Sequence, residues 1–168
     1  MAMRVLVLLA VFVAAVVFYN VGGNRLDEAK VRDYYASAEQ AMLAFDDERL
    51  CAMVDEDFEQ VSVTRIESME QRETFDRDGY CRTTAETMAR LRQLQGAMGG
   101  RSPVRLKYTL VSIRIAPDKR SAEVESRSTL EMPGIRMTSR ARDVVVRKRW
   151  KVLATRSTGT TLMGPAYR

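Results

Sequence analysis

One carboxylate in the C-terminal half of the chain is placed for proton chemistry. Side chains alternate between the two faces of a strand, and in the segment 135–147 this alternation puts Asp143 among the apolar side chains. The same face of this segment and of its neighbours carries four hydroxyl side chains, Ser126, Ser128, Ser139 and Tyr108. Burial in such a polar pocket would raise the pKa of the Asp143 carboxyl and make it a proton carrier. Asp143 and Tyr108 are therefore the catalytic candidates.

Two alternatives for Asp143 stay open at this point. A β-bulge would shift the register and turn its side chain to solvent. An arginine such as Arg156 could instead pair with the carboxylate. A pocket on this face could also hold a small ligand without doing chemistry on it.

The complete absence of histidine excludes several kinds of site. A Ser-His-Asp or Cys-His nucleophile, a zinc site with imidazole ligands and an imidazole pH switch cannot be built. The acidic runs 46–48 and 55–57 border predicted helix ends, where carboxylates cap helices and interact favourably with the helix dipole. We therefore expect no metal site and no cofactor.

Two cysteines, Cys51 and Cys81, are the only ones in the chain. In an oxidising compartment they could form one disulfide, and a loop of about 30 residues closed in this way adds about 3 to 4 kcal/mol in the chain-entropy model. Two unrelated buried thiols are the alternative. We expect the disulfide, because the N-terminus indicates export.

The N-terminal segment predicts a membrane device. Residues 5–19 contain no charged side chain, and residues 5–23 would reach about 28 Å as a helix, close to the thickness of the hydrocarbon core. We expect residues 1–23 to be a transmembrane anchor or an uncleaved signal, and residues 24–168 to be an exported domain. The expected location is the bacterial inner membrane, single pass, with the C-terminal domain in the periplasm. Secretion to the periplasm after signal cleavage is the alternative.

Charge is distributed unevenly along the chain. Residues 26–80 carry 16 acidic and 6 basic side chains, whereas residues 81–168 carry 6 acidic and 19 basic ones. A candidate basic patch on the later strands comprises Arg136, Arg140, Arg142, Arg147, Lys148, Arg149 and Lys151. Such a patch could attract anionic lipid or an acidic partner, or be an ordinary solvated face. Nucleic acid is not an expected partner, because interleaved aromatic side chains are missing.

The hydrophobic spacing predicts helices first and strands afterwards. The expected helices are a long one from Leu26 to Phe45, a short one at 47–54 and a third one capped by Asp78 and ending before Gly96. The expected strands are 58–66, 104–116, 121–132, 135–148 and 150–161, while 67–78 is a polar stretch. This order predicts an α+β domain in which helices cover one face of a curved, mainly antiparallel sheet.

The order of elements resembles the nuclear transport factor 2-like superfamily over about residues 26–161. The residues that carry this resemblance are Asp33-Tyr34-Tyr35, Asp55-Glu56-Asp57-Phe58 and Trp150-Lys151-Val152. The resemblance implies a cystatin-like cone, a half barrel with a pocket in its mouth. Some members of the superfamily use the pocket for isomerase or dehydratase chemistry, and many serve only in binding or assembly. Membrane-anchored members include periplasmic assembly factors of type IV secretion systems.

The expected function is a non-enzymatic binding or assembly role in a membrane complex. In this interpretation residues 5–23 contact the membrane, and the sheet face contacts a protein partner or a second copy of the chain. The alternative is a small-molecule-binding domain, or an isomerase or hydrolase, that uses Asp143 and Tyr108 in the cone. A deep cavity containing Asp143 favours the alternative, whereas a cone filled by Met and Leu side chains favours assembly.

Overall fold

The computed structural model describes residues 11, 12, 14–16, 19 and 23–166. Its helices and strands are α2 (Glu28–Leu43), α3 (Asp47–Ala52), β1 (Val54–Ile66), β2 (Met69–Asp76), α4 (Arg77–Ala97), β3 (Arg105–Ile115), β4 (Ser121–Met132), β5 (Ile135–Lys148) and β6 (Lys151–Pro165). The predicted order of helices followed by a four-stranded meander is confirmed.

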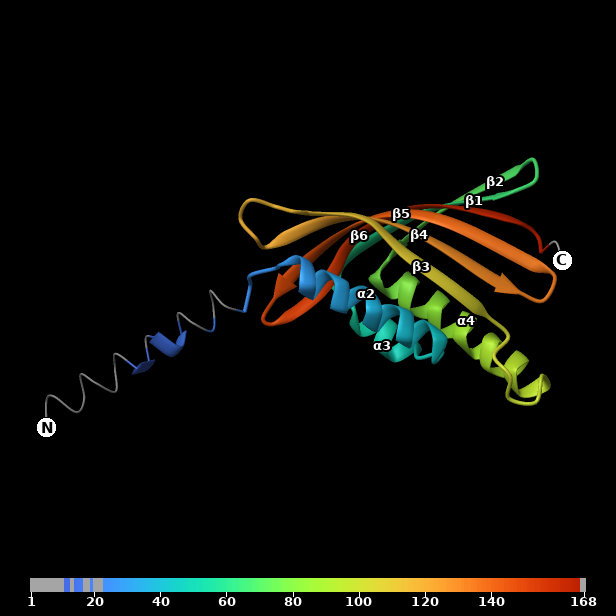
Figure 1. Ribbon diagram of the computed structural model, residues 1–168, viewed down its shortest axis with the longest axis horizontal. Coiled ribbons are helices and arrows are strands. Elements are labelled where there is room, and N and C mark those ends of the chain that lie inside the picture. The colour runs from blue at the N-terminus through green and yellow to red at the C-terminus, as the bar shows by residue number, and fades with distance from the viewer. Residues whose placement is uncertain (1–10, 13, 17–18, 20–22, 167–168) are drawn as a thin grey trace, which may run out of the picture.

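The strands form one six-stranded sheet in the order β2-β1-β6-β5-β4-β3. Strands β3 to β6 are successive antiparallel neighbours, β1 and β2 form an antiparallel hairpin, and β1 runs parallel to β6. The sheet is therefore mixed, with a single parallel pair among its described strands. Figure 1 shows the curved sheet with all three labelled helices on one side of it. We call the side that the helices cover the inner face and the opposite side the outer face.

Three aspartates start the three helices. The side chains of Asp27, Asp46 and Asp76 each accept a hydrogen bond from the backbone N–H three residues later, at 2.8 to 2.9 Å. This satisfies one of the N–H groups that a helix start leaves unpaired. The predicted cap Asp78 is therefore wrong: the helix starts two residues earlier, and Asp78 lies in its first turn.

Strand β2 falls in the stretch that the sequence marked only as polar. Nearly all of its side chains are exposed, so it shows no alternation of apolar and polar residues. The β1–β2 hairpin extends beyond the helices (Figure 1), so only Phe75 of β2 is half-buried. The hairpin register pairs Ile66 with Met69, and Arg65 and Glu70 form an ion pair at 2.8 Å.

The buried apolar side chains form two clusters. The larger one joins α2 to the inner face of the sheet, and its members include Leu26, Val31, Tyr35, Val54, Phe58, Ala122, Val124, Val145 and Ala154. The smaller one lies among the helices and the end of the sheet, and it contains Ala41, Phe45, Leu50, Met88 and Val104. Helix α2 contributes to both, so it fixes the space between the helices and the sheet.

Cys51 of α3 and Cys81 of α4 form a disulfide with a Cα–Cα distance of 5.1 Å. The predicted pairing is confirmed. The bridge joins the short helix α3 to the start of the long helix α4. Because α3 has only six residues, it has little stability of its own and depends on such a link.

The predicted membrane segment, residues 5–23, lies mostly outside the described residues. Within the described part of the chain, none of the helices combines the length and the apolar character needed to cross a membrane.

Removal of the disulfide should destabilise the domain. We expect the Cys51→Ser/Cys81→Ser variant to lose about 3 to 4 kcal/mol of free energy of unfolding, because the 30-residue loop is no longer closed in the unfolded chain. Urea denaturation of the oxidised wild-type protein and the variant measures this. Two freely alkylated thiols in the native, non-reduced protein would contradict the bridge itself.

Candidate functional site

A cavity of about 340 Å³ lies between the helices and the inner face of the sheet. Five aromatic side chains line it, namely Tyr34, Tyr35, Phe58, Tyr80 and Tyr108. Six hydroxyl side chains line it from the strands, namely Ser62, Ser126, Ser128, Ser139, Ser157 and Thr161. The cone therefore encloses a space with aromatic walls and a hydroxyl-rich face, and Asp143 also lines it.

Asp143 points inward from β5 and is only 9% exposed. Its Oδ2 accepts a hydrogen bond from the hydroxyl of Tyr35 at 2.7 Å, and its Oδ1 accepts one from the hydroxyl of Ser157 at 2.7 Å. The inward orientation expected from the strand alternation is thus the one in the structure. Two donors from different elements hold the carboxylate in one orientation.

Neither alternative for Asp143 describes its position. The register between β5 and β6 does shift, but between Val144 and Val145, so Asp143 keeps its inward direction. The guanidinium of Arg156 lies 4.0 Å from the carboxylate of Glu59 instead.

Burial raises the pKa of the Asp143 carboxyl above its ordinary value. The hydrogen bonds from Ser157 and Tyr35 favour the charged form and offset part of this rise. A carboxylate with a raised pKa in a cavity can take up a proton more readily than one on the surface.

Like Ser157, the other donor to Asp143, Tyr35 was not a catalytic candidate from the sequence. Its ring lies 5.6 Å from that of Tyr108 in a stacked arrangement and meets the ring of Tyr34 edge to face at 5.1 Å. Burial, followed by the nearby Asp143, raises the pKa of Tyr35, so it stays protonated and remains a donor. The helical spacing placed Tyr35 on the buried side of α2. The signal that could have found it is that a buried tyrosine hydroxyl needs a polar partner.

Tyr108 lies in the same cavity, as predicted, on strand β3. Burial raises its pKa, and a hydrogen bond with Ser126 offsets part of that rise. Its ring stacks on Tyr35, the residue that contacts Asp143 directly. Tyr35 therefore contacts the Asp143 carboxylate, whereas Tyr108 lines the wall of the cavity.

Of the seven predicted patch residues, three form ion pairs with a carboxylate and a fourth is buried. Arg136 pairs with Glu131 at 3.7 Å and Arg142 with Glu125 at 2.8 Å on the neighbouring strand. Lys148 pairs with Asp55 at 2.8 Å. Arg147 is buried on the inner face, so it lies apart from any patch on the outer face.

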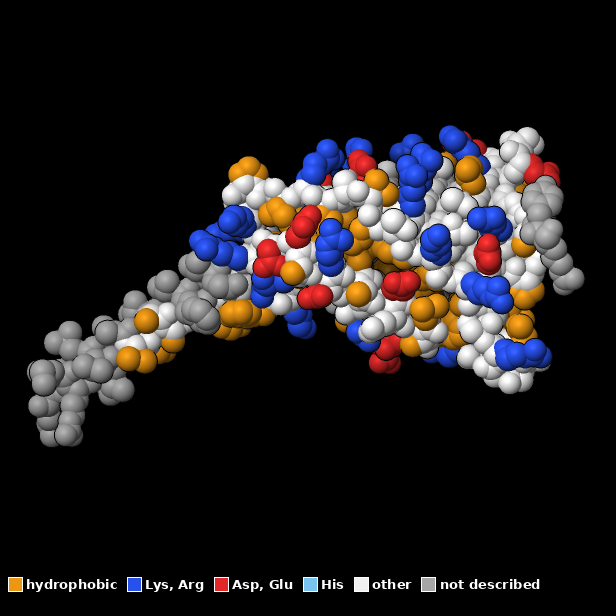
Figure 2. Space-filling view, in the orientation of Figure 1, with side chains coloured by type: hydrophobic (Ala, Val, Ile, Leu, Met, Phe, Trp, Pro, Cys, Tyr) orange, Lys and Arg blue, Asp and Glu red, His pale blue; other side chains and the backbone are white. Residues whose placement is uncertain are grey.

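The remaining three residues are exposed: Arg140 on the outer face, Arg149 in the β5–β6 turn and Lys151 at the start of β6. Figure 2 shows basic and acidic side chains interspersed over the visible face. The seven residues do not form one continuous basic surface.

Among the residues that the structure describes, no group of three or more Cys, Asp or Glu side chains could hold a metal ion.

The comparisons identify the fold. No protein-family model matches the sequence. A search of curated proteins finds no match either. Solved structures do match, and they include nuclear transport factor 2-like and cystatin-like proteins. The chain therefore has the α+β nuclear transport factor 2-like fold.

Three solved structures illustrate the likeness. A scytalone dehydratase-like protein from Novosphingobium aromaticivorans has 16% identity and a TM-score of 0.62, over 83% of this chain and 87% of that one. An NTF-2-like protein of unknown function from Shewanella oneidensis has 14% identity and a TM-score of 0.56, over 79% and 97%. A ketosteroid isomerase-like protein from Erwinia carotovora has 11% identity and a TM-score of 0.50, over 79% and 94%.

The raised pKa of Asp143 predicts how the Asp143→Asn variant depends on pH. A buried carboxyl whose pKa is raised in the folded state costs no stability below its unfolded pKa, and it costs stability once pH rises through the folded pKa. Asparagine carries no charge. The free energy of unfolding of the variant should therefore rise relative to that of the wild-type protein as pH increases from about 3 to 7. Urea denaturation across this range measures the difference.

The control is Asp118→Asn, in the exposed turn between β3 and β4, where the carboxylate accepts a backbone hydrogen bond from Arg120 at 3.0 Å and lies outside the cavity. It measures the effect of removing a carboxylate that is not buried. A flat difference for Asp143→Asn, or one that moves the opposite way, would show that burial does not govern this carboxyl. The test uses the slope with pH and not the absolute stability, because the variant also alters two hydrogen bonds.

Proposed function

We propose that the cone binds a small, mostly apolar organic molecule and that Asp143 accepts a hydrogen bond or a proton from it. The observation that carries this proposal is the position of Asp143, a buried carboxylate that lines a cavity of about 340 Å³. Ligand pockets of proteins have volumes of about 300 to 1,000 Å³ and combine apolar walls with a few fixed polar groups. A molecule of one or two rings is the size that suits this space.

The lining selects the chemistry of the ligand. The aromatic rings of Tyr34, Tyr35, Tyr80 and Tyr108 offer flat apolar contact. The charge of Asp143 at the wall disfavours an anion and favours a group that donates a hydrogen bond, such as a hydroxyl or a polarised C–H. A neutral phenol, alcohol or ketone therefore fits the lining better than an acid does.

The same geometry supports proton transfer. Asp143 would take a proton from the bound molecule and return it at a neighbouring atom or to the leaving group. Tyr35 and Ser157 stabilise the carboxylate before the transfer and hold it in place. The names of two similar structures, dehydratase-like and isomerase-like, are consistent with chemistry of this kind. A single carboxylate is enough for such a step, and the absence of histidine does not oppose it.

The other expected role, assembly of a membrane complex through the outer sheet face, stays a prediction. The ion pairs of Arg136 and Arg142 with glutamates of β4 reduce the net charge available there to a partner.

A phenol that changes colour on ionisation tests the proposal. We expect 4-nitrophenol to bind the wild-type protein saturably in its neutral form, because the carboxylate accepts its hydroxyl and repels its anion. Asp143→Asn should weaken binding about tenfold, the factor for losing a hydrogen bond to a charged acceptor. Difference absorbance spectra report both the affinity and the ionisation state of the bound probe.

The matched control is again Asp118→Asn, which should bind the probe like the wild-type protein. Circular dichroism shows whether each variant is folded. Equal affinities of the wild-type protein and Asp143→Asn, or no saturable binding at all, would refute the role of Asp143 in the cone.

A further inference from the structure

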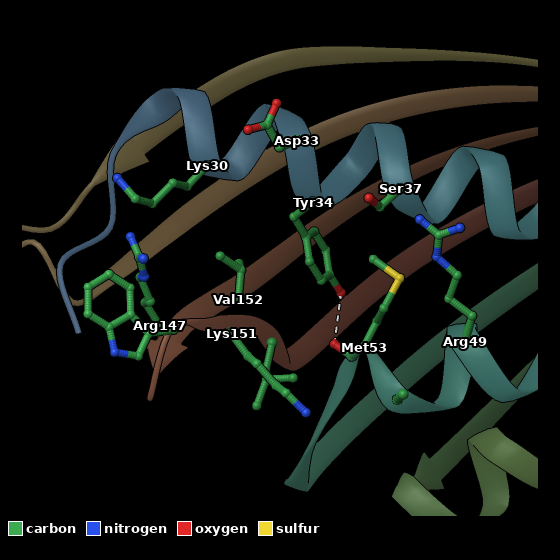
Figure 3. Close-up of a pocket in the computed structure, with 12 residues that line it drawn as sticks. Lys30, Asp33, Tyr34, Ser37, Arg49, Met53, Arg147, Lys151 and Val152 are labelled. Carbon is green, nitrogen blue, oxygen red and sulfur yellow. Dashed lines mark hydrogen bonds between the residues drawn. The ribbon is translucent and has the colours of Figure 1, made fainter. Parts of the chain in front are cut away.

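A second cavity, of about 420 Å³, lies on the other side of Tyr34 from the cone. Its walls come from the first half of α2, from α3 and the residue after it, and from the β5–β6 turn. Four basic side chains line it, namely Lys30, Arg49, Arg147 and Lys151, and a single acidic side chain, Asp33. Figure 3 shows Lys30 and Arg147 at one end and Arg49 at the other end.

Arg147 is the most buried of the four cations of this cavity. It is only 8% exposed, and its guanidinium lies 5.3 Å from the ring centroid of Trp150. Its Nη1 donates to the carbonyl oxygen of Arg25 at 2.7 Å, but its Nε has no hydrogen-bond partner among the described residues. A buried guanidinium charge is costly unless a nearby anion compensates it.

The other cations of the cavity leave positive charge in excess. Lys30 pairs with Asp27, whose carboxyl also feels the charge of Arg147. Within the described part of the chain, neither Arg49 nor Lys151 forms an ion pair, and both are exposed. The four cations outnumber the carboxylates of Asp27 and Asp33 by two, so about two further negative charges can be neutralised at this site.

We propose that this cavity binds the phosphate group of an anionic phosphate ester. Phosphate offers several acceptor oxygens and a charge near the excess at the site, and guanidinium and ammonium groups are its usual protein partners. The phosphate would lie at the end where Lys30 and Arg147 are close together, and the rest of the ester would extend along α2 toward Arg49 (Figure 3).

The site adjoins the point where the chain enters the domain. The N–H of Trp150 donates to the carbonyl oxygen of Gly23 at 2.8 Å, and the N–H of Arg149 donates to the side chain of Asn24 at 3.0 Å. Residues 23–25 therefore run directly past the cavity. If residues 5–23 enter a membrane as the sequence predicts, the phosphate comes from a lipid headgroup; otherwise it comes from a soluble ester.

Trp150 gives a direct readout, because it is the only tryptophan in the chain and it lines the cavity. The full-length protein is mixed with phosphatidylcholine vesicles and titrated with glycerol 3-phosphate. In a second arm it is mixed with vesicles that contain increasing amounts of phosphatidylglycerol. We expect a saturable change in Trp150 emission in at least one arm.

The variants Arg49→Gln and Lys151→Gln should each raise the concentration for half-maximal change about threefold, because each removes one positive charge from the lining of the cavity. These exposed residues are chosen because replacement of Arg147 also removes its bond to Arg25. Matched controls on the exposed outer face are Arg127→Gln and Lys107→Gln, which should titrate like the wild-type protein.

The two arms identify the source of the phosphate. A response to both probes supports a site for the phosphate group itself, and a response to phosphatidylglycerol alone supports a lipid headgroup site. No response in either arm overturns the proposal. So does a loss in the control variants equal to that in Arg49→Gln and Lys151→Gln.

Discussion

The hydrogen bond from Tyr35 to Asp143 is the contact on which the interior of this domain depends. It joins α2 to β5 across 108 positions of the sequence, and Tyr35 belongs to the larger apolar cluster. A carboxylate buried there without donors would cost several kcal/mol, so Tyr35 and Ser157 must both be in place. The position of α2 over the sheet and the orientation of Asp143 are therefore set together.

Strand alternation was enough to place Asp143, Ser126 and Ser139 on the inner face, because β5 keeps its period of two through Arg147 and the register shift falls at Thr155 of β6. Tyr35 could not be assigned in the same way. A helical stripe shows which side of α2 is buried but not which strand residue faces each side chain. That pairing depends on the curvature of the sheet and on the rotation of α2, which are properties of the whole domain.

The ion pairs on the outer face show the same limit of prediction from the sequence. The sequence shows that Arg136 and Arg142 share a face of β5, but their neutralisation depends on the register that sets Glu131 and Glu125 beside them. The sequence pattern also did not indicate that β2 is a strand, because an exposed edge strand needs no alternation of apolar and polar residues. The sequence pattern shows on which face of a helix or strand each residue lies. The register between strands determines which residues of the neighbouring strand it contacts.

Tyr34 and Tyr35 are neighbours in α2, but they serve different cavities. Tyr35 donates to Asp143 in the cone, whereas the Tyr34 hydroxyl donates to the carbonyl oxygen of Met53 at 3.1 Å, and its side chain lines both cavities. The wall between the two cavities thus includes one tyrosine ring that is bonded to the α3–β1 junction. A ligand in either cavity can influence the other only if it displaces this ring or shifts α2. Since α2 is packed against the sheet and fixed by Asp143, the two sites should behave as nearly independent ones.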